Sequence, residues 1–189
     1  FYAERGLPPI FRLTPFSQPA GLDEALAGAG YTTLDRTLVM TSTLDLASNE
    51  IPASVRFTAD AEWLDAFDRL RELEPDKRAH HRRIIEAAEG ERLFALVEPN
   101  GAPIACGLGI IVDEMLGLFD LFTAEDHRHR GHGTAIVGGT LRRAVARDAQ
   151  SAYLQVHSEN LPAQRLYARF GFETAYRYWY RIGPQQQVG

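Results

Sequence analysis

The hydrophobic and polar positions of residues 52–182 follow strand and helix periods in turn. The pattern predicts strands over residues 55–58, 93–97, 103–112, 115–123 and 152–156, helices over residues 60–73, 77–88, 131–148 and 161–170, and closing strands from Phe172 and the run 176–180. The short link between the strands at 103–112 and 115–123 indicates an antiparallel meander, with a turn at Pro99-Asn100-Gly101 before it. Helices interspersed among strands in this way are typical of an α/β (α+β) fold with a mixed sheet covered by helices.

Local signals refine two of these helices. Asp60 is the expected N-cap of the first helix, whose inward face carries Trp63 and Phe67. Gly138 and Gly139 lie inside the third helix, where each costs up to ~1 kcal/mol relative to alanine. We therefore expect these glycines to lie at a close contact between that helix and the sheet.

The first 48 residues form a separate segment. Their pattern predicts a strand, a helix and a strand over residues 9–14, 22–27 and 37–41. Residues 152–181 have the same order, and sliding one segment onto the other places Gly30 on Gly171 and Leu26 on Tyr167. Two interpretations stay open: the tail of a degenerate duplicate whose head lies upstream, or an N-terminal β-α-β extension that adds strands and buries a sheet edge. The predicted domains are 1–48 and 52–182, and because the chain begins with Phe1 we expect residues before it.

Composition and charge narrow the functional class. The chain has 189 residues, 45% of them hydrophobic, and a formal net charge of −5, which argues against a nucleic-acid-binding surface. No stretch approaches the ~20 apolar residues needed to cross a membrane. The single cysteine, Cys106, cannot form an intramolecular disulfide and suits a cytoplasmic protein. Its apolar neighbours predict a small buried residue in a strand.

The most informative segment is residues 121–134, where a strand passes through a tight turn into a helix. A helix N-terminus has unpaired N–H groups and a positive dipole, so it binds phosphate readily. Gly131 and Gly133 remove side chains that would hold a pyrophosphate away from those amides, while Arg128 and Arg130 add positive charge. The segment has neither the Gly-Lys-Ser/Thr of a Walker loop nor the three spaced glycines of a dinucleotide-binding turn.

Histidines near this turn raise the question of a metal site. His127, His129 and His132 alternate with arginines, whose charge would repel a cation, so we predict no metal. The run Ala79-His80-His81-Arg82-Arg83 is interpreted as a solvated helix face.

A second motif lies over residues 154–172: a strand, Asn160, a helix with Tyr167, and then Gly171-Phe172. The two segments together, in this order and spacing, resemble the GNAT superfamily of acyl-CoA N-acyltransferases over residues 52–181. The resemblance implies a GNAT-like central mixed sheet flanked by helices. It also implies transfer of an acetyl group from acetyl-CoA to a primary amine, by direct attack in a ternary complex and without a metal.

Carried over by position, the resemblance implies a role for each motif residue. Backbone groups of Leu121, Phe122 and Thr123 would pair with the pantetheine arm like an added strand. The expected pyrophosphate site comprises Arg128, His129, Arg130, Gly131, His132, Gly133 and Thr134. Asn160 would hydrogen-bond the cofactor near its arm, and Tyr167 is the expected catalytic residue that gives a proton to the departing sulfur.

The general base stays open. Gln155 stands where several family members have a glutamate, and an amide cannot usefully accept a proton. Asp120, His157 and Glu159 remain candidates, as does a water relay. This departure motivates an alternative function, a catalytically degenerate CoA-binding module that serves as a sensor or a partner-binding subunit.

The acceptor is not specified by the sequence beyond a small-molecule or peptide amine. Trp63, Trp179 and Tyr180 are candidates either for its pocket or for the core. A homodimer through the C-terminal strands is a further open expectation, and neither a nucleic acid nor a membrane is expected as a partner.

Overall fold

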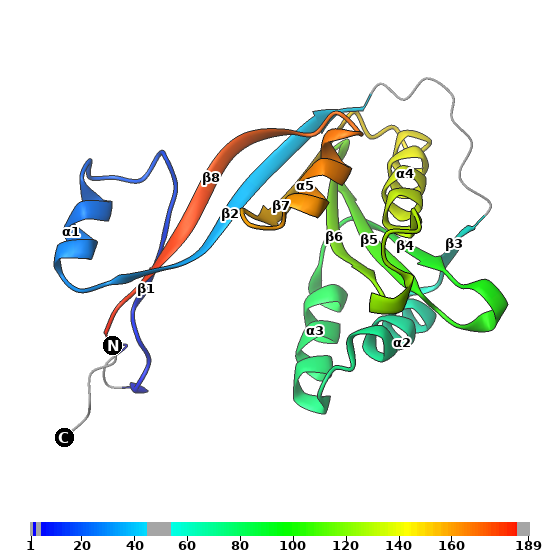
Figure 1. Ribbon diagram of the computed structural model, residues 1–189, viewed down its shortest axis with the longest axis horizontal. Coiled ribbons are helices and arrows are strands. Elements are labelled where there is room, and N and C mark those ends of the chain that lie inside the picture. Colours follow the sequence, from blue (N-terminus) through cyan, green and yellow to red (C-terminus); the bar gives the residue numbers. More distant parts are fainter. Residues whose placement is uncertain (1, 3–4, 45–53, 185–189) are drawn as a thin grey trace. The chain divides into compact units, whose positions relative to one another are not determined.

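The computed structural model describes residues 2, 5–44 and 54–184, and Figure 1 shows their elements. The strands are β1 (Ile10–Leu13), β2 (Thr32–Thr43), β3 (Val55–Thr58), β4 (Glu91–Val97), β5 (Ala105–Val112), β6 (Met115–Thr123), β7 (Ser151–His157) and β8 (Glu173–Ile182). The α-helices are α1 (Leu22–Gly28), α2 (Asp60–Arg71), α3 (Pro75–Ala87), α4 (His132–Val145) and α5 (Leu161–Ala168), with 3-10 turns at Pro99–Gly101 and Glu125–His127. The predicted boundary between residues 48 and 52 lies outside the described residues.

The strands form one eight-stranded sheet in the order β1-β8-β2-β7-β6-β5-β4-β3. Pairing is antiparallel from β3 through β6 and between β1 and β8, while β6 and β7 run parallel. The predicted mixed sheet flanked by helices and the antiparallel meander of β5 and β6 are therefore confirmed. Among the described residues, no helix is long and apolar enough to cross a membrane.

By compactness, the chain divides into two units. Unit 1 comprises Phe1–Met40, Gln155–Gln164 and Glu173–Gly189, and unit 2 comprises Thr41–Leu154 and Arg165–Phe172. These units differ from the predicted domains, which stay a prediction.

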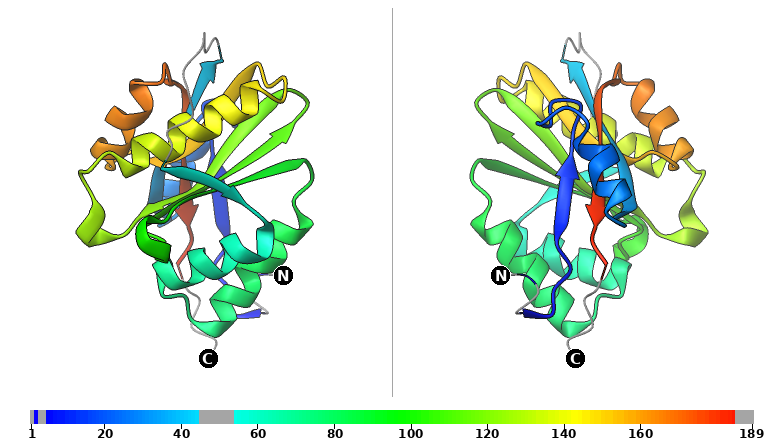
Figure 2. Two further views of the ribbon diagram at one scale, coloured as in Figure 1. Left: turned by 90° about the vertical axis from the view of Figure 1, so that its right-hand side faces the viewer. Right: turned by 90° about the vertical axis from the view of Figure 1, so that its left-hand side faces the viewer.

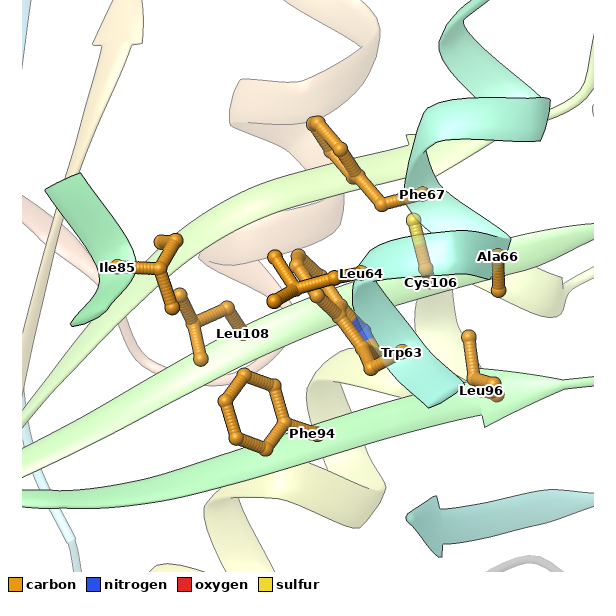
Figure 3. Close-up of a cluster of buried hydrophobic side chains, with 9 residues drawn as sticks. All are labelled: Trp63, Leu64, Ala66, Phe67, Ile85, Phe94, Leu96, Cys106 and Leu108. Carbon is orange, nitrogen blue, oxygen red and sulfur yellow. The ribbon is translucent and has the colours of Figure 1, made fainter. Parts of the chain in front are cut away.

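The sheet of unit 2 is covered on both faces, as Figure 2 shows for its helices. Successive residues of a strand point to opposite faces. Cys106 and Leu108 of β5 therefore pack against α2, in a cluster that comprises Trp63, Leu64, Ala66, Phe67, Ile85, Phe94, Leu96, Cys106 and Leu108 (Figure 3). Trp63 is fully buried there, and its Nε1 donates a hydrogen bond to the Ala95 carbonyl at 3.1 Å, so this side chain belongs to the core rather than to a pocket.

The opposite face of the sheet packs against α4. Val55, Ala95 and Ile136 belong to its buried cluster. A Cβ on Gly139 would lie 3.1 Å from Cγ1 of Val55, which confirms the predicted helix–sheet contact at this glycine. Gly138 instead lies against Phe170, which a Cβ would approach to 3.2 Å. Glycine at both positions lets α4 lie close to its neighbours.

Helix boundaries differ from the prediction in two places. Ala59, rather than Asp60, is the N-cap of α2, and Asp60 is the first helical residue. The prediction of Asp60 as the cap was therefore wrong. The next helix begins at Pro75 instead of after it, because proline at the first helical position lacks only an N–H that would be unpaired there.

The C-terminal region also differs. Instead of two closing strands, the described residues up to 184 form one, β8, which begins after the buried Phe172 and contains the whole aromatic run. The run continues as one strand because nothing in it interrupts extended backbone, and its alternate residues face opposite sides of the sheet.

The N-terminal segment does more than cover a sheet edge. Its strand β2 is longer than predicted and lies inside the sheet, between β8 and β7, while β1 takes the edge beside β8. The segment therefore adds strands to the sheet, as the second interpretation expects, but β2 lies inside the sheet rather than covering its edge. The pairing of β2 was invisible in the sequence because its neighbours lie more than a hundred residues further along the chain.

The two β-α-β segments share their local geometry at an offset of 141 residues (172 − 31). The Tyr31 amide donates to the Leu26 carbonyl at 3.0 Å, and the Phe172 amide donates to the Tyr167 carbonyl at 3.3 Å. In each turn the residue before the donating amide is a glycine with a positive φ angle, 85° at Gly30 and 78° at Gly171. The same offset carries the first residue of β2 onto the first residue of β8. The helix-to-strand turns of the two segments are therefore built alike.

Candidate functional site

The centre of strand β6 in unit 2 is irregular. Its register with β5 shifts between Cys106 and Leu108, which pair with Phe122 and Phe119, and Asp120 in the shifted stretch has a positive φ of 49°. Such a bulge redirects side chains and ends regular pairing. The parallel pairing of β6 with β7 ends at Leu118 in the described residues, so the remainder of β6 has a strand partner only on its β5 side.

This open stretch includes Leu121, Phe122 and Thr123, the residues predicted to pair with an extended ligand. A strand edge without a partner presents N–H and C=O groups that an extended chain can bind. The Thr123 carbonyl already accepts a hydrogen bond from Arg128 Nε at 3.3 Å. The geometry therefore suits an added strand along part of this stretch.

The turn from β6 into α4 has the features of an anion site. Gly131 is the N-cap in the left-handed conformation, with φ 83°, and no side chain caps the helix. Ala135 donates the first backbone hydrogen bond, to the Gly131 carbonyl at 2.9 Å. The amides of residues 129–134 have no acceptor among the residues that the structure describes. They remain available to phosphate oxygens at the positive end of the helix dipole.

The glycines of this turn leave room for a ligand. A Cβ on Gly131 would meet no atom within 4 Å. One on Gly133 would lie 3.2 Å from Cδ1 of Leu166 and 3.8 Å from Oγ1 of Thr123, so a side chain here would fill the space between α4, α5 and the end of β6. The turn therefore fits a pyrophosphate bound by backbone amides.

The charged side chains of the turn are less available to a bound anion than their number suggests. Arg128 bonds within its own loop, to Thr123 and, with Nη1 3.5 Å from Oε1, to Glu125. His129 and Arg130 are exposed, and the His127 and His132 rings lie 6.3 Å apart. The described residues contain no group of three or more His, Cys, Asp or Glu side chains placed to hold a metal ion.

Tyr167 of α5 lies in the same unit as this turn. Its ring is 8% exposed and packs edge-to-face on Phe172, with 6.1 Å between the ring centroids. The hydroxyl has no hydrogen-bond partner among the described residues. Burial raises the pKa of this phenol, because the phenolate would lose its hydration, so the group keeps its proton at neutral pH. It is therefore available as a proton donor.

Asn160 and the residues around it belong to unit 1. Asn160 Oδ1 accepts the Ala163 amide at 3.2 Å, which caps the start of α5 and leaves the Asn160 side-chain NH₂ free to donate. Gln155 accepts a hydrogen bond from the Tyr178 hydroxyl at 2.6 Å. Among the predicted bases, His157 and Glu159 are both exposed.

The third base candidate, Asp120, has a partner that sequence reasoning missed. His81 Nε2 lies 2.9 Å from Asp120 Oδ2, and the imidazole stacks on Phe67 with ring centroids 4.4 Å apart. The His81 side chain is 17% exposed and that of Asp120 28%, while His81 Nδ1 is buried without a partner. One signal was present in the sequence: His81 precedes the buried Ile85 by one helical turn, which places both on the inward face of α3.

The interpretation of residues 79–83 as a solvated face was therefore wrong for two of its members. Besides His81, Arg82 turns inward and bridges Asp65 at 2.6 Å and the buried Asp68 at 2.5 Å. Hydrogen bonds from Arg82 hold the pKa of Asp65 below its usual value. A buried carboxylate requires such a partner, which explains why a charged helix faces the core here.

Cys106 is fully buried, as predicted. Burial raises its pKa to about 12, so the thiolate needed for nucleophilic chemistry is suppressed at neutral pH. This cysteine is a packing residue.

Comparison with known proteins gives a consistent result. The sequence profile of the acetyltransferase (GNAT) family matches residues 57–172. The chain is 31% identical over 188 residues to the uncharacterized N-acetyltransferase YobR of Bacillus subtilis (strain 168), and the alignment covers 96% of this chain and 76% of YobR.

Solved structures share the fold. A GCN5-related N-acetyltransferase from Kribbella flavida superposes with a TM-score of 0.70 at 21% identity, covering 99% of this chain and 72% of that protein. A tandem GNAT protein from the clavulanic acid biosynthesis pathway superposes with a TM-score of 0.65 at 15% identity, covering 97% of this chain and 67% of that one.

Proposed function

Because the chain belongs to the GNAT acetyltransferase family, we propose that it transfers an acetyl group from acetyl-CoA to a primary amine by direct attack in a ternary complex. The observation that carries the proposal is the row of unpaired amides over residues 129–134, beside a glycine whose missing side chain leaves open space. Backbone amides at a helix N-terminus bind pyrophosphate without needing a particular side chain. This explains why a loop-bound Arg128 does not weaken the proposal.

The chain's own residues divide the remaining work. Acetyl-CoA supplies an acyl group activated as a thioester. The free edge of β6 at residues 121–123 binds the extended arm, and the Asn160 side-chain NH₂ donates to it. As the new N–C bond forms and the C–S bond breaks, Tyr167 gives its proton to the leaving sulfur. The buried ring and the hydroxyl without a partner among the described residues support this role.

The amine proton goes to Asp120 in this proposal. Of the three candidate bases, Asp120 alone lies in unit 2 with the turn and Tyr167, at the bulge where β6 loses its second strand partner. His81 acts as a positioning residue: its Nε2 fixes one carboxylate oxygen and leaves Oδ1 free to accept a proton.

Two variants test the base. Asp120→Asn should lower kcat/KM ~10²-fold without changing acetyl-CoA affinity, since general-base catalysis contributes on this order. His81→Phe keeps the stack on Phe67 but removes Nε2, so kcat should fall about tenfold while KM for the amine and the unfolding midpoint stay unchanged. Glu159→Gln, at an exposed carboxylate, is the matched control. Full activity of Asp120→Asn would contradict the assignment of Asp120 as the base.

The function itself is tested in two steps. Calorimetric titration of the purified chain with acetyl-CoA, beside free CoA, should show saturable binding to one site. Thiol release should then be screened over a panel of small and peptide amines. A folded chain that binds neither ligand would contradict the proposal.

One observation favours the alternative of a catalytically degenerate CoA-binding module. The Gln155 amide cannot act as a base, and its side-chain oxygen accepts a hydrogen bond from Tyr178. A sensor would bind acetyl-CoA with normal affinity but release no thiol with any amine in the panel. Turnover with a single amine would exclude it.

We also propose that residues 1–48 are the tail of a degenerate GNAT duplicate. Three observations support this: the matched turns at Gly30 and Gly171, the matched starts of β2 and β8, and the likeness to a structure described as a tandem GNAT protein. Leu26 stands at the position of Tyr167 and Pro19 at that of Asn160, so this copy lacks both polar side chains.

A further inference from the structure

Unit 1 contains a cavity of about 480 Å³ within the range of small-molecule sites. Its wall includes Asp23 of α1, Arg36 and Leu38 of β2, and Arg177 and Trp179 of β8. Every lining residue belongs to unit 1, so the cavity is complete within that unit. None of the residues assigned to acetyl transfer lines it.

Asp23 lies near enough to Arg36 for their charges to attract each other, but neither arginine of this cavity is bonded to an acid. Neither Arg36 nor Arg177 forms a salt bridge or a side-chain hydrogen bond with any described residue. The Arg36 carbonyl accepts the Ser158 amide at 2.8 Å, which holds the backbone beneath its guanidinium in place. Two unpaired guanidinium groups on one cavity wall favour an anion, because a carboxylate can accept paired hydrogen bonds from each.

The acid in the wall is already paired. Asp23 Oδ1 accepts hydrogen bonds from Arg181 Nε at 2.7 Å and Trp179 Nε1 at 2.9 Å. Hydrogen bonding to Arg181 and then to Trp179 lowers the pKa of Asp23, so the carboxylate stays ionised and bound to these partners. Its negative charge still lies in the wall, which disfavours a dianion such as phosphate more than a monoanion.

The repeat described above adds an independent argument. At the offset of 141 residues Arg36 corresponds to Arg177, Leu38 to Trp179 and Asp23 to Gln164, and all six residues line the cavity. Equivalent positions of the two β-α-β segments thus meet around one space. Among these three pairs, the charge differs only between Asp23 and Gln164. The six residues therefore carry two positive charges and one negative charge.

We infer that this cavity is a binding site for a small monocarboxylic acid, whose carboxylate lies between Arg36 and Arg177 and whose apolar body lies against Leu38 and the indole of Trp179. Binding there needs no acetyl-CoA. It is therefore separable from the proposed transferase activity.

The two tryptophans provide the measurement. The chain has Trp63 and Trp179 only, so the ¹H–¹⁵N spectrum of the full labelled chain contains two indole signals, assigned with Trp179→Phe. Benzoate is the probe and benzamide its neutral isostere. Benzoate should move the Trp179 signal saturably and leave the Trp63 signal, from the core of unit 2, in place. Benzamide should bind at least ~10-fold more weakly.

Matched arginine variants locate the site. Arg36→Gln and Arg177→Gln should each weaken benzoate binding ~10-fold, whereas Arg83→Gln, at an exposed arginine of α3, should not. An unfolding midpoint equal to that of the unsubstituted chain shows that each variant is folded. Equal binding of benzoate and benzamide, undiminished affinity in both pocket variants, or no shift up to roughly 10 mM benzoate would overturn the inference. Tighter binding of inorganic phosphate than of benzoate would overturn the choice of a monocarboxylate.

Discussion

The segments 10–43 and 151–182 have the same order of elements and the same hydrogen bond across the turn from helix to strand, yet only the second carries the polar residues of the candidate site. Leu26 and Tyr167 occupy equivalent positions and are each 8% exposed. The scaffold therefore requires a large buried side chain at this position and a left-handed glycine four residues later. The hydroxyl is not needed for the turn, which makes Tyr167 the residue to test for chemistry.

The largest effect should come from this pair of positions. Tyr167→Phe keeps the ring against Phe172 and removes only the proton donor, so turnover should fall ~10²–10⁴-fold with acetyl-CoA affinity nearly unchanged. Leu26→Met, the matched change in the other segment, should leave turnover within about twofold. Steady-state kinetics and calorimetry on both variants measure this. If Tyr167→Phe keeps its turnover, the hydroxyl has no part in the reaction.

The second-largest effect is expected from a comparison of substitutions at two helix N-termini. Gly131 and Gly21 are both N-caps with φ 83°, at the starts of α4 and α1. Gly131→Asp puts a negative charge among the free amides and should weaken acetyl-CoA binding at least ~10²-fold, because charge repulsion adds to the loss of close approach. Gly21→Asp carries the same backbone strain and should leave binding intact. Equal affinity in both variants would place the phosphates elsewhere in the protein.

The smallest effect concerns the shared turn itself. Gly30→Ala and Gly171→Ala should each lower the free energy of unfolding by about 1–2 kcal/mol, the cost of a side chain at positive φ. Gly171→Ala should cost more, because its Cβ would lie 3.2 Å from Ser42 Oγ, whereas that of Gly30 meets nothing within 4 Å. Gly28→Ala, with the same open space at ordinary φ, is the control for chemical denaturation. Neutral substitutions at both turns would mean that the two turns are not under the same constraint.

Much of this organisation was predictable because it depends on neighbouring residues. Apolar runs separated by a short link predicted β5 and β6, and the glycine-containing turn predicted the start of α4 within one residue. The GNAT family followed from two motifs and is confirmed by the sequence comparisons. The roles of the individual site residues stay predictions.

What escaped prediction depends on contacts between distant residues. The position of β2 between β7 and β8 follows from pairing across more than a hundred residues, which no local pattern encodes. The His81–Asp120 contact joins α3 to a bulge in β6, and the sequence gives no sign of that bulge. The cavity of unit 1 likewise requires β2 and β8 to lie side by side. For this reason the His81 partner of Asp120 and the second binding site emerged only from the structure.

The position of β2 in the sheet also affects how the nascent chain folds during synthesis. On the ribosome β2 is made well before its neighbour β8, which is the last described strand. Until β8 has left the ribosome, β2 exposes a long backbone edge, a state that invites pairing with other chains. Pairings so distant in sequence also form slowly. The nascent chain is therefore most prone to aggregate in the interval between the synthesis of β2 and that of β8, when a chaperone would protect it most.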